Sequence, residues 1–174
     1  MIYLKISFKL KRDLQAFIDE NFINDIKSDI SDAFFAAFDS IFISDKSQKL
    51  QMENLNEILD TKKPTFSRTL MNFIDEHGLK DSDVYNKAGI SRQLFSKIRI
   101  HENYKPTKST IFLFALAMKL NLEETKELLA SAGYSLSHSF RQDLILEFLI
   151  SKGIHDISFI NDVLYEFGEP TLGV

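Results

Sequence analysis

The sequence predicts a mainly α-helical protein whose small N-terminal segment combines helices with one strand. Three observations support this fold class. After Pro64, apolar residues recur at intervals of three and four, the spacing of helices that bury one face. Single glycines and capping residues separate these segments at short intervals. At the N-terminus, residues 2–10 alternate between apolar and polar side chains, as a half-buried strand does.

Residues 1–63 are expected to form a separate N-terminal segment. After the strand, helical spacing of apolar residues follows in three stretches: 10–18, 26–38 and 55–59. A lone strand leaves backbone groups without partners. Its partner is either residues 41–44 or the same strand of a second copy, which would make the protein a homodimer. The junction with the next segment is placed at Pro64, because proline disfavours a helical residue before it.

Seven helices with short connections are predicted after Pro64. Glycine ends a helix readily, and we expect Gly78 to stop the first helix and Gly89 the second. A polar side chain at the start of a helix accepts a hydrogen bond from its free N–H groups. The expected caps are Asp81 or Ser82 for the second helix and Ser91 for the third, which runs to about Ile100.

The last four helices are delimited in the same way. A strongly apolar helix follows Pro106 and continues through Leu120. Asn121 and Glu124 stand at the spacing of a capping box, in which each side chain bonds to the other residue's backbone N–H. Gly133 closes that helix. The remaining caps are Ser139 with Gln142, again as a capping box, for the sixth helix and Asp156 for the seventh.

The composition fits a folded protein without cysteine chemistry. The chain has 174 residues, of which 44% are hydrophobic, and it contains 16 Phe and no Cys. The phenylalanines can supply a large core, and the missing cysteines exclude disulfides and thiolate sites. The apolar runs at 111–120 and 143–150 are shorter than the roughly 20 residues of a membrane span. With no signal-peptide pattern, the sequence predicts a cytoplasmic protein.

Positive charge is concentrated in the middle of the chain, although the net charge is −4. Residues 61–110 carry ten basic and five acidic side chains, whereas both flanking regions are acidic. Between Tyr85 and Lys108 the only acidic residue is Glu102. The local field of such a segment can attract phosphate whatever the total charge. An ordinary solvated face is the other interpretation, and charge alone does not separate the two.

Residues 84–98, VYNKAGISRQLFSKI, predict two short helices that meet at a steep angle. Gly89 tolerates the positive φ that the turn needs. Ile90 would fill the space under the turn, while Phe95 and Ile98 would anchor the second helix to the core. The opposite side is left with long or polar donors suited to phosphate oxygens and base edges: Arg92, Gln93, Ser96, Lys97 and Arg99.

These residues resemble the lambda-repressor-like (XRE-type) helix-turn-helix family, which includes the phage Cro and repressor proteins. The resembling positions are Val84, Ala88, Gly89, Ile90, Ser91, Phe95, Ile98, Pro106 and the apolar helix that ends at residues 117–120. The resemblance covers Ser67 to Ala132 and implies the family's five-helix domain over residues 64–133. In that family the second helix of the motif lies in the major groove.

The resemblance implies that the protein is a sequence-specific, double-stranded DNA-binding transcriptional regulator. Base contacts are implied for Arg92, Gln93 and Lys97. Phosphate contacts are expected from Ser91, Ser96, Arg99, Lys105 and Lys108. No catalytic residue, metal or cofactor is expected. The four His lack metal-ligand spacing, and the sequence has neither a glycine-rich phosphate loop nor a nucleophile turn.

A non-enzymatic protein-interaction or adaptor module on the same scaffold is the alternative. Residues 134–174 resemble a C-terminal extension, here of two helices, that follows similar units in bacterial proteins. This extension is acidic and apolar, and Tyr85 and His101 stand where the family usually has Ala and Gly. The two hypotheses differ in one expectation. DNA binding requires that Arg92, Gln93 and Lys97 be exposed together, whereas the adaptor hypothesis allows other segments to cover them.

Overall fold

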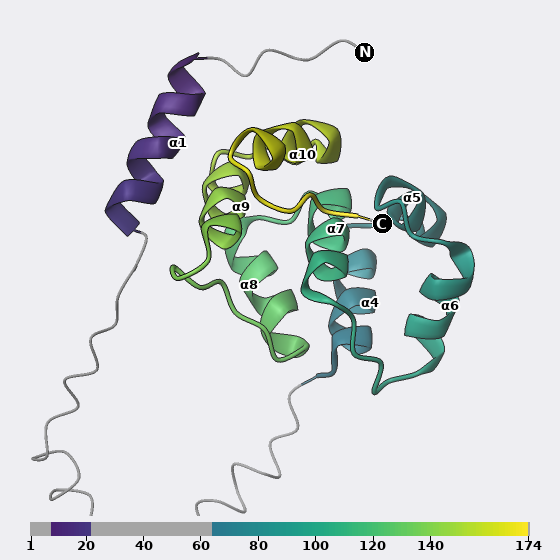
Figure 1. Cartoon of the computed structure of the whole chain (residues 1–174). Helices are drawn as coiled ribbons and strands as arrows, with labels where there is room; N and C mark the ends of the chain where they lie inside the picture. The colour runs from purple at the N-terminus through teal and green to yellow at the C-terminus, as the bar shows by residue number, and fades with distance from the viewer. Residues whose placement is uncertain (1–7, 22–63, 174) are drawn as a thin grey trace, which may run out of the picture. The chain divides into compact units, whose positions relative to one another are not determined.

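The computed structural model describes residues 8–21 and 64–173, and every regular element in these two ranges is an α-helix (Figure 1). Helix α1 (Phe8–Asn21) precedes Pro64. The helices after Pro64 are α4 (Phe66–Glu76), α5 (Asp81–Lys87), α6 (Arg92–Ile100), α7 (Lys108–Met118), α8 (Leu122–Ser131), α9 (Arg141–Ser151) and α10 (Ile157–Glu166). The mainly helical class and the seven helices after Pro64 are therefore confirmed. None of the described helices is both long and apolar enough to cross a bilayer.

Helix α1 shows that the expected strand is wrong at its C-terminal end. Residues 8–10 form the first turn of α1, because the helical spacing that continues through Leu14 and Ile18 extends back over them. Both of these side chains are buried, as a helix face requires. Residues 2–7, and the other elements expected before Pro64, lie outside the described residues. Pairing of the strand and dimerisation through it stay predictions.

Helix α1 packs against the C-terminal helices. The ring of Phe17 lies 5.3 Å from the ring of Phe148 in α9, measured between centroids. Lys11 forms an exposed ion pair with Glu166 in α10. The first helix therefore belongs to the same compact unit as the residues that follow Pro64.

Three of the predicted helix caps are confirmed. Ser91 Oγ accepts a hydrogen bond from the Leu94 N–H at 3.2 Å, and Asp156 Oδ1 accepts one from the Phe159 N–H at 2.7 Å. Asn121 and Glu124 form the expected capping box, with bonds of 3.0 and 2.7 Å. These caps satisfy N–H groups that would otherwise have no partner within their helices.

Two predicted caps are wrong. Helix α5 begins at Asp81, and its N-cap is Lys80, whose side chain makes no capping bond. At α9 the N-cap is Phe140 rather than Ser139. The Gln142 amide, expected in a capping box, instead donates to the Pro170 carbonyl at 2.6 Å. A tertiary contact to the end of the chain has replaced the local bond that the spacing suggested.

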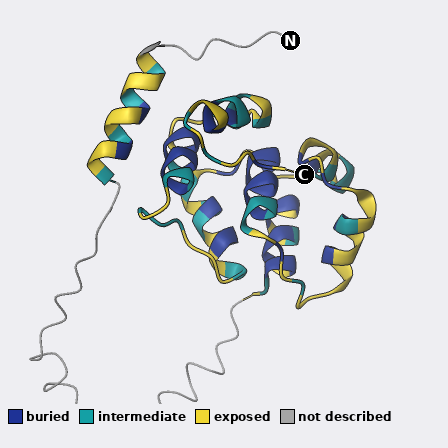
Figure 2. Ribbon diagram, in the orientation of Figure 1, coloured by how far each residue is buried: buried dark blue, intermediate teal, exposed yellow. Residues whose placement is uncertain are grey.

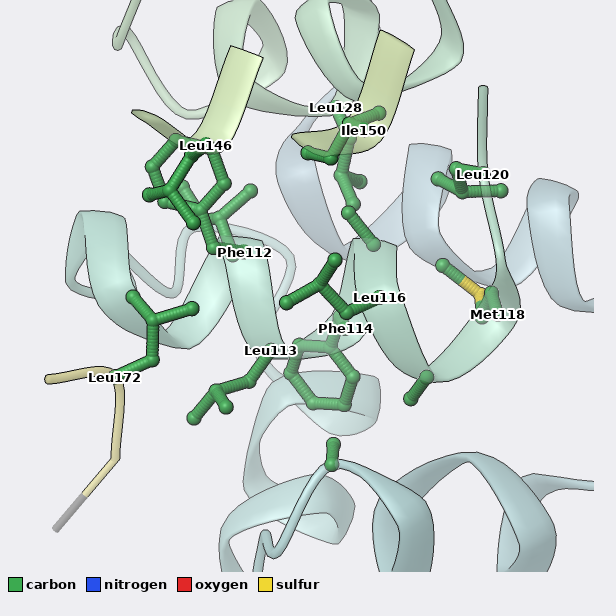
Figure 3. Packing of buried hydrophobic residues seen from close by; sticks show 14 of the residues in the cluster. Phe112, Leu113, Phe114, Leu116, Met118, Leu120, Leu128, Leu146, Ile150 and Leu172 are labelled. Carbon is green, nitrogen blue, oxygen red and sulfur yellow. The ribbon is translucent and has the colours of Figure 1, made fainter. Parts of the chain in front are cut away.

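Helix α7 forms the centre of the core, and all of its residues from 111 to 118 are buried (Figures 2 and 3). It contacts α5, α8 and α10. The ring of Phe114 is fully buried between two other rings, at 6.3 Å from Phe66 in α4 and 6.0 Å from Phe95 in α6. The helix ends at Met118, two residues before its expected end, because Lys119 adopts a left-handed conformation with φ of 57°.

The end of the chain is fixed to the helices by side-chain bonds. The Asn161 amide donates to the Leu172 carbonyl at 2.9 Å and accepts from the Leu172 N–H at 2.7 Å. This pair of bonds directs the Leu172 side chain into the hydrophobic cluster that contains Phe112 and Leu113 (Figure 3). The C-terminal extension therefore shares one core with the helices before it.

Replacement of Leu172 by alanine is expected to lower the free energy of unfolding by about 2 kcal/mol, the lower end of the range for buried leucines. The effect is placed there because Leu172 lies outside the helices, where the backbone can shift to close part of the cavity. Urea unfolding followed by circular dichroism measures it. Tyr165→Ala, at a side chain that is 73% exposed, is the control and should change stability by less than about 0.5 kcal/mol. If Leu172→Ala and Tyr165→Ala are equally stable, Leu172 does not contribute to a core shared with the preceding helices.

Candidate nucleic-acid interface

Helices α5 and α6 are joined by a four-residue connection that turns at Gly89. Gly89 has φ of 65°, a region that residues with a side chain seldom adopt. A Cβ atom at this position would meet nothing within 4 Å, so the requirement for glycine is conformational rather than steric. On either side of it, Ala88 and Ile90 are buried. The positive φ expected at Gly89 and the burial expected for Ile90 are therefore confirmed.

Helix α6 has one buried and one exposed face. Phe95 and Ile98 are buried, at 4% and 0% exposure, and hold the helix on the core. The Phe95 ring lies 5.5 Å from the ring of Tyr85 in α5. Tyr85 thus adds an aromatic contact between α5 and α6. The burial of Phe95 and Ile98 leaves the polar residues of α6 facing outward (Figure 2).

Arg92, Gln93 and Lys97 are exposed together, as DNA binding requires. Arg92 and Gln93 occupy the first two positions of α6. Within residues 8–21 and 64–173, neither of these two side chains makes a hydrogen bond or an ion pair. They are therefore available to a ligand on the part of the surface that the structure describes.

The cations at the two edges of this exposed face each have a neighbour. The Lys97 ammonium lies 5.7 Å from the centre of the Tyr104 ring, within range of a cation–π interaction. Arg99 forms an ion pair with Asp81 at the start of α5. These contacts restrict both long side chains, and the second one also offsets the charge of Arg99.

The expected phosphate-binding residues fall into two groups. Ser91, Ser96, Arg99 and Lys105 are exposed on α6 or in the connections at its two ends. Lys108 is different, because it forms an ion pair with the buried Asp143 of α9 and its side chain is only 25% exposed. Asp143 also accepts a hydrogen bond from the Ser137 N–H at 2.8 Å. The structure thus ties Lys108 to the C-terminal extension.

The connection after α6 does not require glycine at its first residue. His101 caps α6 with φ of −99° and ψ of 96°, which is extended backbone open to any residue. Its carbonyl oxygen accepts hydrogen bonds from Ser67 Oγ at 3.1 Å and from the Tyr104 N–H at 2.9 Å. The bond from Ser67 holds the connection after α6 against α4, and the bond from Tyr104 closes a turn within the connection.

Two residues of this surface were missed by sequence reasoning. Ile100 is 71% exposed, although it was taken only as the end of the helix. Its spacing of seven residues from Gln93 could have placed it on the exposed face. Asp81 was assigned as a cap, but its partner is Arg99, 18 residues later. Local sequence spacing does not predict an ion pair between residues that are 18 positions apart.

A surface hollow of about 410 Å³ lies between α5 and α6. It is lined by Asp81, Ser82, Tyr85, Arg92, Phe95, Ser96 and Arg99.

The chain matches no protein-family model, no curated protein and no solved structure. The arrangement of the exposed side chains on α6 is therefore the basis for assigning a function.

Proposed function

We propose that α4 to α8 form a helix-turn-helix domain of the lambda-repressor-like type, and that the protein binds double-stranded DNA as a sequence-specific transcriptional regulator. One observation carries the proposal. Arg92 and Gln93 stand exposed at the first turn of α6, and Lys97 follows one turn later on the same face. Helix α6 contains no acidic residue, so nothing within it opposes the approach of a polyanion.

The chemistry of these side chains suits base edges in the major groove. An arginine can donate two hydrogen bonds to guanine, and a glutamine can pair with both the acceptor and the donor of adenine. The major groove is wide enough to admit an α-helix. Ser91, Ser96 and Lys105 would hold the flanking phosphates. Lys108 is left out of the proposed interface because Asp143 neutralises its charge.

Gel-shift titrations of the full chain with random-sequence duplexes, at about 50 mM and about 200 mM salt, test the proposal. Each phosphate contact should steepen the fall of log affinity against log salt by about 0.9, because bound counterions are released. A complex that forms at low salt and weakens steeply supports DNA binding. If no duplex is shifted at the lower salt concentration, the proposal is wrong.

Gln93→Ala and Lys105→Ala are expected to have different effects. Loss of a base contact should reduce the preference for the selected sequence by about 1–3 kcal/mol, whereas loss of a phosphate contact should weaken all sequences alike. Competition titrations with a duplex selected from a random pool, and with its scrambled version, measure both effects. If Gln93→Ala lowers the affinities for the selected and the scrambled duplex by the same factor, the assignment of Gln93 to bases is wrong.

A protein-interaction module is the second candidate, and the exposed Ile100 favours it. An isoleucine that is 71% exposed on the same face as Gln93 and Lys97 would suit a partner protein. Isolated apolar residues are nevertheless common on protein surfaces. Arg92 and Gln93 have no partner among the described residues and fit base edges better, so DNA remains the leading candidate.

A further inference from the structure

An ion pair crosses the hollow between α5 and α6 at the edge of the proposed DNA-binding face. Asp81 is the first residue of α5, and Arg99 lies in the last turn of α6. Their side chains are 35% and 59% exposed, so both remain accessible to solvent and to a ligand. The position of this pair sets the charge that the edge of the interface presents to a phosphate.

Asp81 neutralises only one of the two arginines that line the hollow. Arg92, Ser96 and Arg99 are spaced by four and three residues, so they follow one line along α6. At a rise of about 1.5 Å per residue, the two arginines start roughly 10 Å apart along the helix. Arg92 makes no ion pair with any described residue. The available positive charge is thus concentrated at the N-terminal end of this line.

We infer that Asp81 limits the affinity of the protein for DNA by holding Arg99 away from phosphate. This inference rests on the proposed function. A phosphate that binds Arg99 would have to break the ion pair with Asp81. The phosphate would then lie close to the free carboxylate of Asp81, which has the same sign of charge. Both effects oppose the contact. In the native chain Arg99 therefore adds little to the number of phosphates that are neutralised.

Asp81→Asn is the direct test, with salt-dependent titrations of a random-sequence duplex. The variant should release Arg99 to one phosphate and steepen the log–log salt slope by about 0.9. The same relation predicts a gain in affinity of about eightfold at 0.1 M salt and about threefold at 0.3 M. Thermal melting confirms that the variant is folded. If the melting temperature of Asp81→Asn is much lower than that of the native chain, Asp81→Ser is used in the same titrations.

Asp83→Asn is the matched control. Asp83 is exposed on the same helix, and its contact among the described residues is a 3.4 Å hydrogen bond from Ser82 Oγ rather than an ion pair. Asp83→Asn removes one negative charge, as Asp81→Asn does, but it releases no arginine. The affinity for the duplex should therefore change by less than about twofold, and the slope of log affinity against log salt should stay constant. The double variant Asp81→Asn with Arg99→Gln should bind the duplex no more tightly than the native chain, because no arginine is released.

The outcomes separate this inference from the proposed function. The inference is wrong if Asp81→Asn leaves the slope of a duplex-binding chain unchanged, or if the double variant keeps the gain. It is also wrong if Asp83→Asn produces an equal gain, because the effect would then be that of net charge. Failure of both the native chain and Asp81→Asn to shift any duplex overturns the two proposals together.

Discussion

Alanine at both Arg92 and Lys97 is expected to lower the affinity for a selected duplex by about 30-fold or more. In the proposed complex each side chain lies at a base edge, where one good contact contributes about 1–3 kcal/mol. A difference of about 1.4 kcal/mol corresponds to a factor of ten in affinity. Both side chains are exposed, so their loss should leave the fold intact. Fluorescence anisotropy titration of a labelled duplex at fixed salt measures the effect.

A double variant elsewhere on the surface controls for net charge. Lys126→Ala with Lys152→Ala removes two cations that lie outside α5 and α6. Their loss should change the affinity by only about two- to threefold, since distant exposed charges are screened at about 0.1 M salt. Equal affinities of the native chain and the Arg92/Lys97 variant would overturn the assignment of α6 as the DNA-reading helix.

Alanine in place of Phe114 is expected to lower the free energy of unfolding by about 3–5 kcal/mol. The side chain is fully buried, and its ring touches Phe66 in α4 and Phe95 in α6. Its removal leaves a cavity between the core and the helix that carries Arg92. Equilibrium denaturation in guanidinium chloride, followed by circular dichroism, gives the change in stability.

Phe140→Ala provides the comparison for this second variant. The Phe140 side chain is 63% exposed, so the same chemical change should alter stability by less than about 0.5 kcal/mol. A Phe114 variant that loses less than about 1 kcal/mol would show that its ring is not a packed link between the helices. Because α6 is anchored through Phe95, the Phe114 variant should also bind DNA more weakly than its folded fraction predicts.

Local signals were sufficient to predict the number and order of the helices after Pro64, although not all of their ends. Gly89 specifies a turn because few other residues accept positive φ. Ser91, Asn121 and Asp156 specify helix starts because their side chains reach N–H groups only three residues away. The exposed face of α6 followed from the same reasoning, since burying Phe95 and Ile98 fixes which residues point outward.

Contacts between distant segments could not be predicted in this way. Lys108 was expected to contact phosphate, but it forms an ion pair with Asp143, 35 residues later. Ser139 and Gln142 matched a capping box, but the Pro170 carbonyl offered Gln142 another partner. At residues 8–10 a short alternating pattern was overridden by the helix that continues to Asn21. For Lys108 and Gln142 the deciding partner lies beyond the range of local spacing.

The central position of α7 provides a way to detect a ligand without knowing where it binds. Its buried amides, in residues 111–118, should exchange with deuterium only when the whole domain opens. Any molecule that binds the folded chain alone makes this opening rarer. Slower deuterium uptake along α7 would therefore report a duplex, a partner protein or a small effector equally well. Uptake at exposed surfaces could then be compared to locate the occupied face.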